Sequence, residues 1–181
     1  DEPFAAVDRP TRARLLRLLE EFRRGTGSCA VWVTHDVEDA LEVSDRVAVL
    51  RDGRFEQIAT PERLHAEPAS RFVAACVGFE TFLPGVRVSA GECVTRWGRF
   101  PVAGGADGEE SGLLALRASA LRQDPAGPVR GVVVSCGFRD GHYALRFDCD
   151  GVGALGLSEA PRGRGESVAF AVRAPGTFVR E

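Results

Sequence analysis

The pattern of apolar residues changes once along this 181-residue chain, close to Gly78. Before this glycine, helical spacings alternate with short apolar runs, as in proteins that pack helices on a sheet. After it, glycine and proline are frequent and apolar residues come in short alternating runs, the pattern of strands joined by turns. This change excludes a single all-helical or all-β fold for the whole chain. We therefore predict two structural parts that meet near residues 78–84.

The first part opens with an expected helix. Asp8 is suited to cap it, and Pro10 falls in the first turn, where a missing N–H costs nothing. Four apolar residues recur at the spacing of one helix face, namely Leu15, Leu18, Leu19 and Phe22. Four arginines lie largely off that face: Arg12, Arg14, Arg17 and Arg24. The apolar run over residues 29–33 that follows is typical of a buried parallel strand.

Shorter elements complete the first part. We expect a short helix over 37–43, with acidic residues in its first turn. The turn signal Asp52-Gly53 predicts a hairpin of strands over 46–51 and 54–59. Thr60 and Pro61 are suited to begin another helix, and a last short helix is expected over about 69–77.

The second part predicts short strands only. Six candidate strands cover residues 85–88, 92–96, 113–117, 129–136, 142–149 and 167–173. Asp140-Gly141 is a second hairpin signal. Several short strands at regular spacing favour a small barrel or sandwich.

Composition excludes several classes of protein. The formal net charge of −3 argues against a nucleic-acid-binding surface, which needs a basic face. No run approaches the roughly 18 apolar residues of a membrane span. The five cysteines show no metal-ligand spacing, so we interpret them as reduced, mostly buried thiols of a cytosolic protein.

Two groups of polar residues carry candidate chemistry. Asp1 and Glu2 are adjacent carboxylates, and His35 ends the apolar run between Thr34 and Asp36. Ligands of open α/β sheets bind at the carboxyl ends of strands. A histidine there can reach a phosphate, one carboxylate can hold Mg²⁺ and the next can orient a water for in-line attack. Taken singly, such acids are usually solvated and such a histidine is usually structural. Only the order and spacing of these residues together support a phosphate site.

The order of motifs resembles that of ABC transporter ATPases. Residues 1–8, Asp-Glu-Pro-Phe-Ala-Ala-Val-Asp, look like the end of a Walker B strand followed by a D-loop. Residues 33–40 resemble the switch-histidine loop, and residues 45–53 resemble the strand and turn that come next. Thr60-Pro61-Glu62 and residues 68–78 resemble the lead-out into a C-terminal domain.

This resemblance implies roles for four residues. Asp1 would assist Mg²⁺ coordination, and Glu2 would be the general base that polarises the attacking water. Asp8 would be the D-loop acid that communicates across a nucleotide-sandwich dimer. His35 would contact the γ-phosphate and sense its presence.

Other parts of the family pattern are absent from the sequence. All 23 basic residues are arginine, so no GxxxxGK(S/T) phosphate loop exists within these residues. The signature sequence and the Gln loop are absent too, and in the family all of these precede the position of Asp1. We therefore expect the C-terminal part of a longer subunit, which uses ATP and Mg²⁺. The 181 residues alone are expected neither to bind nor to hydrolyse ATP.

The second part resembles a TOBE domain, a small OB-like barrel appended to importer ATPases. Residues 82–85, 113–117 and 165–168 carry this likeness, although Ala118-Ser119 replaces the usual Pro-Glu. In the family such domains mediate dimer contacts, and some bind a small oxyanion. Five arginines are candidate anion contacts or simply solvated: Arg96, Arg99, Arg117, Arg130 and Arg146. Trp97 and Phe100 could form a stacking platform for single strands. We favour instead packing of Trp97 against a neighbouring domain or subunit.

The predicted fold is an α/β fragment of a P-loop ATPase domain over 1–78, a linker over 79–84, and an all-β OB-like TOBE barrel over 85–181. The predicted function is the energy-coupling subunit of an ABC importer for an inorganic ion, such as ferric iron or an oxyanion, or for a polyamine. Its partners would be a second ATPase copy, integral membrane permease subunits and, indirectly, a solute-binding protein, but no nucleic acid. It would lie in the cytoplasm, peripheral to the inner face of the membrane. The alternative is a regulatory module without catalysis that binds a small anion or stabilises a dimer.

Overall fold

The structure is a computed structural model that describes residues 2–3, 6–89, 91–103 and 109–180. The chain forms two compact units, residues 1–64 and residues 65–181. The second unit therefore begins before the predicted boundary at 78–84. The reason is a short helix, α4 (Arg71–Cys76), that is tied to the β part. The backbone N–H of Arg71 donates to the carbonyl of Arg180 at 3.1 Å, and Phe79 N–H donates to the Ala74 carbonyl at 3.0 Å.

The first unit contains the predicted helices and hairpin. Its elements are α1 (Arg9–Thr26), α2 (Val37–Val43), β1 (Val47–Arg51), β2 (Arg54–Ala59) and most of α3 (Pro61–Ala66). Asp8 caps α1 by accepting the Thr11 N–H at 2.8 Å. Asp52 and Gly53 both have positive φ, 50° and 75°, as a two-residue type I′ hairpin turn requires.

The predicted strand over residues 29–33 is wrong for this chain. These residues adopt no regular structure, and Val31 and Val33 are 92% and 59% exposed. A buried parallel strand needs hydrogen-bonding neighbours and covered faces. Among the described residues the only sheet of this unit is the β1–β2 hairpin, so the segment has no strand to pair with. The P-loop fold of the first part remains a prediction.

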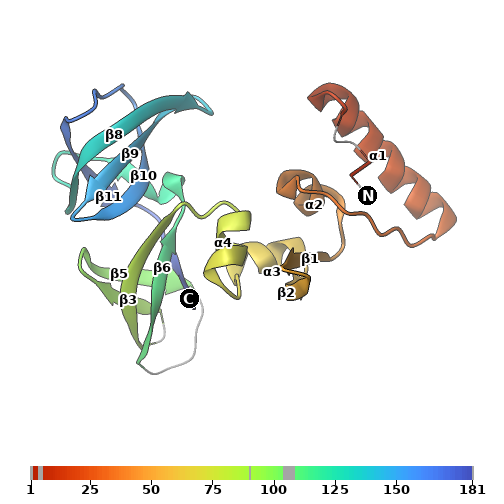
Figure 1. Cartoon of the computed structure of the whole chain (residues 1–181), viewed down its shortest axis with the longest axis horizontal. Coiled ribbons are helices and arrows are strands. Elements are labelled where there is room, and N and C mark those ends of the chain that lie inside the picture. Colours follow the sequence, from red (N-terminus) through yellow and green to blue (C-terminus); the bar gives the residue numbers. More distant parts are fainter. Residues whose placement is uncertain (1, 4–5, 90, 104–108, 181) are drawn as a thin grey trace. The chain divides into compact units, whose positions relative to one another are not determined.

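The second unit holds two closed five-stranded barrels, where the sequence predicted one (Figure 1). The first barrel consists of β3 (Thr81–Ser89), β4 (Glu92–Thr95), β5 (Gly98–Ala103), β6 (Glu110–Leu116) and β12 (Gly176–Val179). The second consists of β7 (Leu121–Gln123), β8 (Val129–Arg139), β9 (His142–Cys149), β10 (Val152–Ser158) and β11 (Ser167–Val172). A 3₁₀ turn, η1 (Ala118–Ala120), joins β6 to β7.

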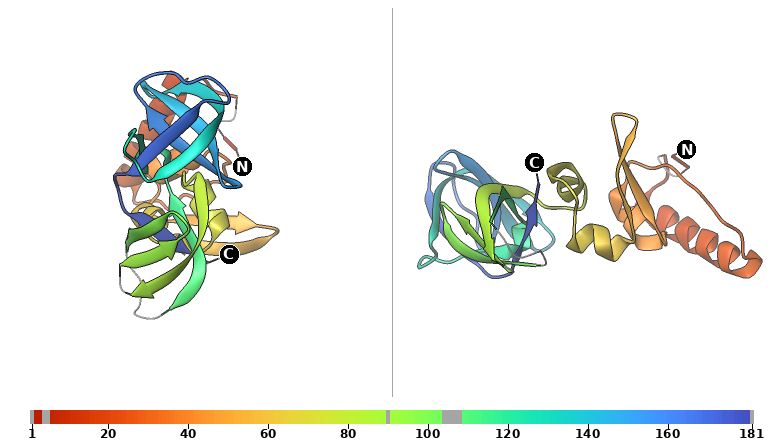
Figure 2. Two further views of the ribbon diagram at one scale, coloured as in Figure 1. Left: turned by 90° about the vertical axis from the view of Figure 1, so that its left-hand side faces the viewer. Right: turned by 90° about the horizontal axis from the view of Figure 1, so that it is seen from below.

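The chain order explains why two barrels form. The chain leaves the first barrel after β6, builds the whole second barrel, and returns as the short β12, which pairs with β5 and β6. Both barrels are visible in the two views of Figure 2. Closure removes the free strand edges that an open sheet would present to solvent.

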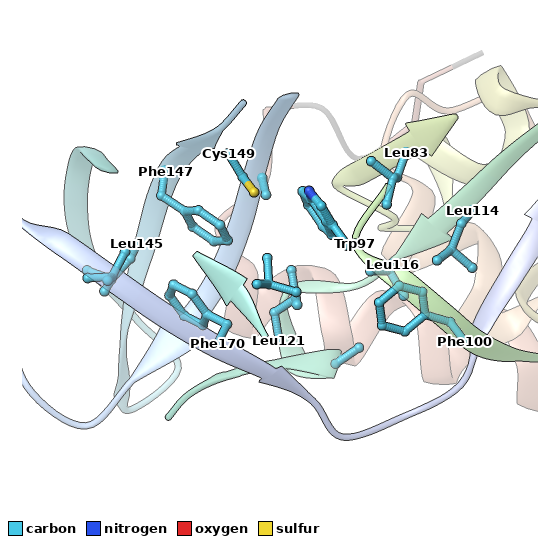
Figure 3. Close-up of a cluster of buried hydrophobic side chains, with 14 of the residues drawn as sticks. Leu83, Trp97, Phe100, Leu114, Leu116, Leu121, Leu145, Phe147, Cys149 and Phe170 are labelled. Carbon is cyan, nitrogen blue, oxygen red and sulfur yellow. The ribbon is translucent and has the colours of Figure 1, made fainter. Parts of the chain in front are cut away.

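The two barrels share one hydrophobic core. In Figure 3 the Trp97 indole of the first barrel lies between Phe147 and Cys149 on one side and Leu83 and Leu116 on the other. Trp97 is only 9% exposed. The rings of Phe147 and Phe170 stack with centroids 4.4 Å apart. Trp97 thus packs within its own unit, because the β4–β5 turn inserts it between the barrels.

Candidate active site

The structure brings together the two side chains that the resemblance assigns to catalysis. Nδ1 of His35 lies 2.8 Å from Oε1 of Glu2, although 33 positions separate them in sequence. The side chains of His35 and Glu2 are 73% and 48% exposed, so solvent and ligands can reach the pair. The contact uses Nδ1, and the second ring nitrogen, Nε2, takes no part in it. Asp1 lies outside the described residues.

A backbone contact sets the distance between these two side chains. The N–H of Glu2 donates to the carbonyl of Val33 at 2.7 Å, two residues before His35. Glu2 has a φ of 43°, in the left-handed region that non-glycine residues adopt only under constraint. Residues 29–33, which the sequence predicts to be a strand, therefore still bond to the segment that carries Glu2.

The loop after His35 is fixed by short-range capping. The N–H of Asp36 donates to Thr34 Oγ1 at 3.0 Å, and Asp36 Oδ1 accepts the Asp39 N–H at 3.3 Å. Asp36 is thereby the N-cap of α2, as a polar side chain that satisfies an orphan helix N–H. His35 is thus held one residue before a capped helix.

Asp8 is occupied by its own helix. The N–H and the side-chain hydroxyl of Thr11 both hydrogen-bond its carboxylate and lower its pKa below the usual range. This confirms the capping role that the sequence predicts. The role of Asp8 across a dimer, which the resemblance implies, stays a prediction.

Three of the candidate anion-binding arginines have partners within this chain. Arg96 Nη1 donates to the Asp150 carbonyl at 2.6 Å, and Arg99 pairs with Glu92 at 2.9 Å. Arg117 Nη1 donates to the Val77 carbonyl at 2.5 Å, and its guanidinium lies 4.1 Å from the centroid of the Phe79 ring. Burial lowers the pKa of Arg117. Anion binding by these three residues stays a prediction. Their contacts show that each of them also joins parts of this chain.

Other candidate residues are placed as follows. Trp97 and Phe100 are 9% and 6% exposed, so neither ring offers a surface on which a base could stack. His142 Nδ1 lies 3.1 Å from the Asp140 carbonyl. Over the described ranges, no three His, Cys, Asp or Glu side chains gather as metal ligands would. Across those same ranges, no helix has the length and apolar content needed to cross a membrane.

The cysteines are more varied than the sequence predicts. Cys93 and Cys149 are buried, and burial raises the pKa of both thiols. Cys76 is half-buried, whereas Cys29 and Cys136 are exposed. Of the two exposed thiols, Cys29 lies in the irregular segment after α1 and Cys136 lies in the exposed part of β8, so both differ from the predicted burial.

Sequence reasoning missed Arg12, which it left off the apolar face of α1. Its guanidinium forms ion pairs with Asp36 and, at 3.3 Å, with Asp39 (Figure 1 shows α1 and α2). No spacing within α1 marks Arg12 apart from the neighbouring arginines. The sequence signal that could have found Arg12 was the pair of acids at the start of α2, Asp36 and Asp39, because two nearby carboxylates favour a cation between them.

A scan against models of known protein families finds no match. Individual relatives are clear, however. The chain is 34% identical over 176 residues to an Fe(3+) ions import ATP-binding protein of Streptomyces avermitilis, covering 94% of this chain and 50% of that protein. It is 45% identical over 126 residues to a sulfate/thiosulfate import ATP-binding protein of Caulobacter vibrioides, covering 70% of this chain and 32% of the relative.

A sulfate/thiosulfate import ATP-binding protein of Xanthomonas campestris is 51% identical over 86 residues, which is 48% of this chain and 25% of the relative. The chain thus spans half or less of the length of these curated relatives. The resemblance inferred from the motifs is confirmed: the chain is a homologue of the ATP-binding proteins of ABC importers, including those for sulfate and ferric ions.

Proposed function

We propose that these residues belong to the energy-coupling subunit of an ABC importer and supply the general base and the γ-phosphate sensor of its ATPase site. One observation carries the proposal: Glu2 and His35 contact each other at 2.8 Å. The Glu2–Val33 backbone bond supports this contact, because it holds the two segments side by side.

The exposed pair suits the attack of water on a phosphate. The Glu2 carboxylate accepts a proton from the attacking water, and its contact with Nδ1 orients the His35 ring. With a proton on both ring nitrogens, Nδ1 donates to Glu2 and Nε2 donates to an oxygen of the γ-phosphate. Bound Mg²⁺ would neutralise charge on the transferred phosphoryl group, and Asp1 is the residue proposed to assist in holding it.

The wider assignment is part of the same proposal. The relatives are named as import ATP-binding proteins for sulfate, thiosulfate or ferric ions, so we propose an inorganic ion as cargo, with a polyamine as the less favoured choice. The working unit would be a dimer of ATPase subunits bound to membrane permeases at the inner face of the membrane. A solute-binding protein would deliver the solute to the permeases. The 181 residues alone lack a phosphate loop, so we propose that they neither bind nor hydrolyse ATP.

The test measures Mg-ATP turnover of the longer protein that we propose contains these residues. Glu2→Gln is expected to lower kcat by on the order of 10³, the typical contribution of a general base. His35→Ala is expected to lower it comparably, while His142→Ala on β9 serves as the matched histidine control and retains turnover. Wild-type turnover by Glu2→Gln, or Glu2-dependent turnover by the 181-residue chain alone, would overturn the proposal.

A further inference from the structure

Arg12 lies in the first turns of α1 and contacts both segments that carry the Glu2–His35 pair. Nη1 donates to Asp36, directly after His35, and at 3.3 Å to Asp39 in the first turn of α2. Nη2 donates to the carbonyl of Val7 at 3.5 Å, in the segment that runs from Glu2 to α1. One guanidinium therefore joins three acceptors on two separate stretches of chain.

These contacts are shielded from solvent. The side chains of Arg12 and Asp39 are 19% and 15% exposed, and that of Asp36 is 33% exposed. Ion pairs hold more strongly when solvent is partly excluded than when both partners are fully exposed. Among the described residues the buried Nε of Arg12 has no hydrogen-bond partner, which is a cost to stability. The side chain thus adopts a position in which Nη1 and Nη2 form hydrogen bonds and Nε forms none.

We propose that Arg12 is a positioning residue that holds His35 against Glu2. This inference rests on the proposed ATPase function of that pair. Two carboxylates, Asp36 and Asp39, face Arg12 from the start of α2. Without the cation these half-buried charges repel each other, the loop that ends at Asp36 loosens, and His35 leaves Glu2. Lysine is a poor substitute, because a single ammonium lacks the planar fork that spans separate acceptors.

The same helix offers a matched control. Arg23 also reaches from α1 toward the α2 region, where it pairs with Asp45 at 2.9 Å. Asp45 follows α2 rather than preceding it, and its side chain is 75% exposed. Arg23→Ala therefore removes an ion pair of the same type from the same helix without touching the loop that carries His35.

The experiment follows the His35 ring by NMR in the 181-residue chain. The response measured is the change in the His35 ring resonances caused by Glu2→Gln, which reports their contact. This response is expected in the wild-type background and in Arg23→Ala, and is lost in Arg12→Ala. Arg12→Lys is expected to fall between them. A residue that only stabilised the fold would lower the melting temperature without changing this response.

Circular dichroism shows whether each variant folds. If Arg12→Ala does not fold, Arg12→Lys and Arg12→Gln decide, and each must weaken the response. A full response in those variants, or in a folded Arg12→Ala, would overturn the inference. In the longer protein, Arg12→Ala is expected to lower kcat by roughly 10- to 100-fold with little change in KM, the scale of a misplaced catalytic group. If the wild-type longer protein shows no turnover, the proposed function fails, and the NMR response still decides the role of Arg12.

Discussion

Glu110, at the start of β6, is a carboxylate held by two arginines from other parts of the first barrel. Arg180 donates to it from Nε at 2.7 Å, and Arg87 of β3 pairs with it on the other oxygen. The Arg87 guanidinium also lies 5.0 Å from the centroid of the Phe178 ring. The hydrogen bond from Arg180, together with the charges of both arginines, lowers the pKa of Glu110 below its usual range.

This arrangement predicts an acid-sensitive contribution to stability. Because the folded-state pKa is depressed, the unfolded chain binds the proton more readily, and stability falls as pH drops. The contribution is present above about pH 4.3, the ordinary value for glutamate, and is lost as pH falls through the folded-state value. Glu110→Gln is expected to lower the melting temperature at pH 7 by a few degrees, and the difference from wild type is expected to shrink as pH falls below about 4.3.

Glu92→Gln provides the comparison, because the Glu92–Arg99 pair is more exposed, at 38% and 66% of the side chains. Exposed pairs contribute little, so this variant is expected to follow the wild-type profile throughout. A difference between wild type and Glu110→Gln that stays constant from pH 7 to pH 3 would contradict the assignment.

Steric fit at Gly127 gives a second prediction at this scale. A Cβ there would lie 2.2 Å from the carbonyl carbon of Phe170, inside the second barrel, where backbone cannot move aside. Gly127→Ala is expected to lower the free energy of unfolding by about 1–3 kcal/mol, the usual cost of overpacking. Gly137→Ala is the matched control, because nothing lies within 4 Å of its Cβ. Urea unfolding of the two variants checks this, and equal midpoints would refute it.

Among the elements, hairpins were the easiest to predict and strand partners the hardest. Asp52-Gly53 and Asp140-Gly141 both form turns with positive φ at the two central residues, as the sequence predicts. Asp150-Gly151 forms a third turn of the same type, which the sequence analysis missed although the same dipeptide marks it. These signals are local, because backbone sterics at the two turn residues decide them.

Closure of the first barrel depends on its shortest element. β12 has four residues and pairs with both β5 and β6. A chain that stops before Gly176 is expected to open this barrel, expose Trp97 and shift its fluorescence to longer wavelength, measured with Trp32→Phe so that Trp97 is the single indole. The second barrel is expected to persist, since none of its strands pairs with β12.

A chain that ends at Arg180 keeps β12 and serves as the control for truncation. Its emission should match that of the untruncated chain. An unchanged emission maximum in the shorter chain would show that β12 is dispensable for burial of Trp97.

At the scale of the whole molecule, apolar exposure is concentrated in the first unit. Val31, Phe22 and Val33 are 92%, 64% and 59% exposed. Among the side chains of α1 that the structure describes, the buried one is Leu16, at 2%, rather than a member of the predicted apolar face, on which Leu18 is 49% exposed. Apolar surface of this kind favours association with another protein surface.

The chain by itself is therefore expected to self-associate as its concentration rises, measured by sedimentation velocity. The double variant Phe22→Ser with Val31→Ser is expected to shift the distribution toward monomer. Phe138→Ser serves as the control, because Phe138 is 68% exposed but belongs to the second unit. A concentration-independent monomer for the unaltered chain would contradict this expectation.

The sequence by itself determined the locally encoded features of this protein. Asp8 and Asp36 cap their helices through hydrogen bonds that span only three residues, and the Asp-Gly turns depend on two residues each. The order of motifs from Glu2 to Gly78 likewise sufficed to identify the relatives. Each cap, turn and motif is encoded by residues close together in the sequence, and the order of the motifs can be read without knowing the fold.

Only the tertiary structure decided which distant segments pair. The return of β12 splits the β part into two barrels, and residues 29–33 form no strand because no described strand lies beside them. The ion pairs of Arg12 with Asp36 and Asp39 join residues 24 and 27 positions apart. Such contacts depend on the free energy of closing long loops and filling a shared core, which no short window of sequence contains.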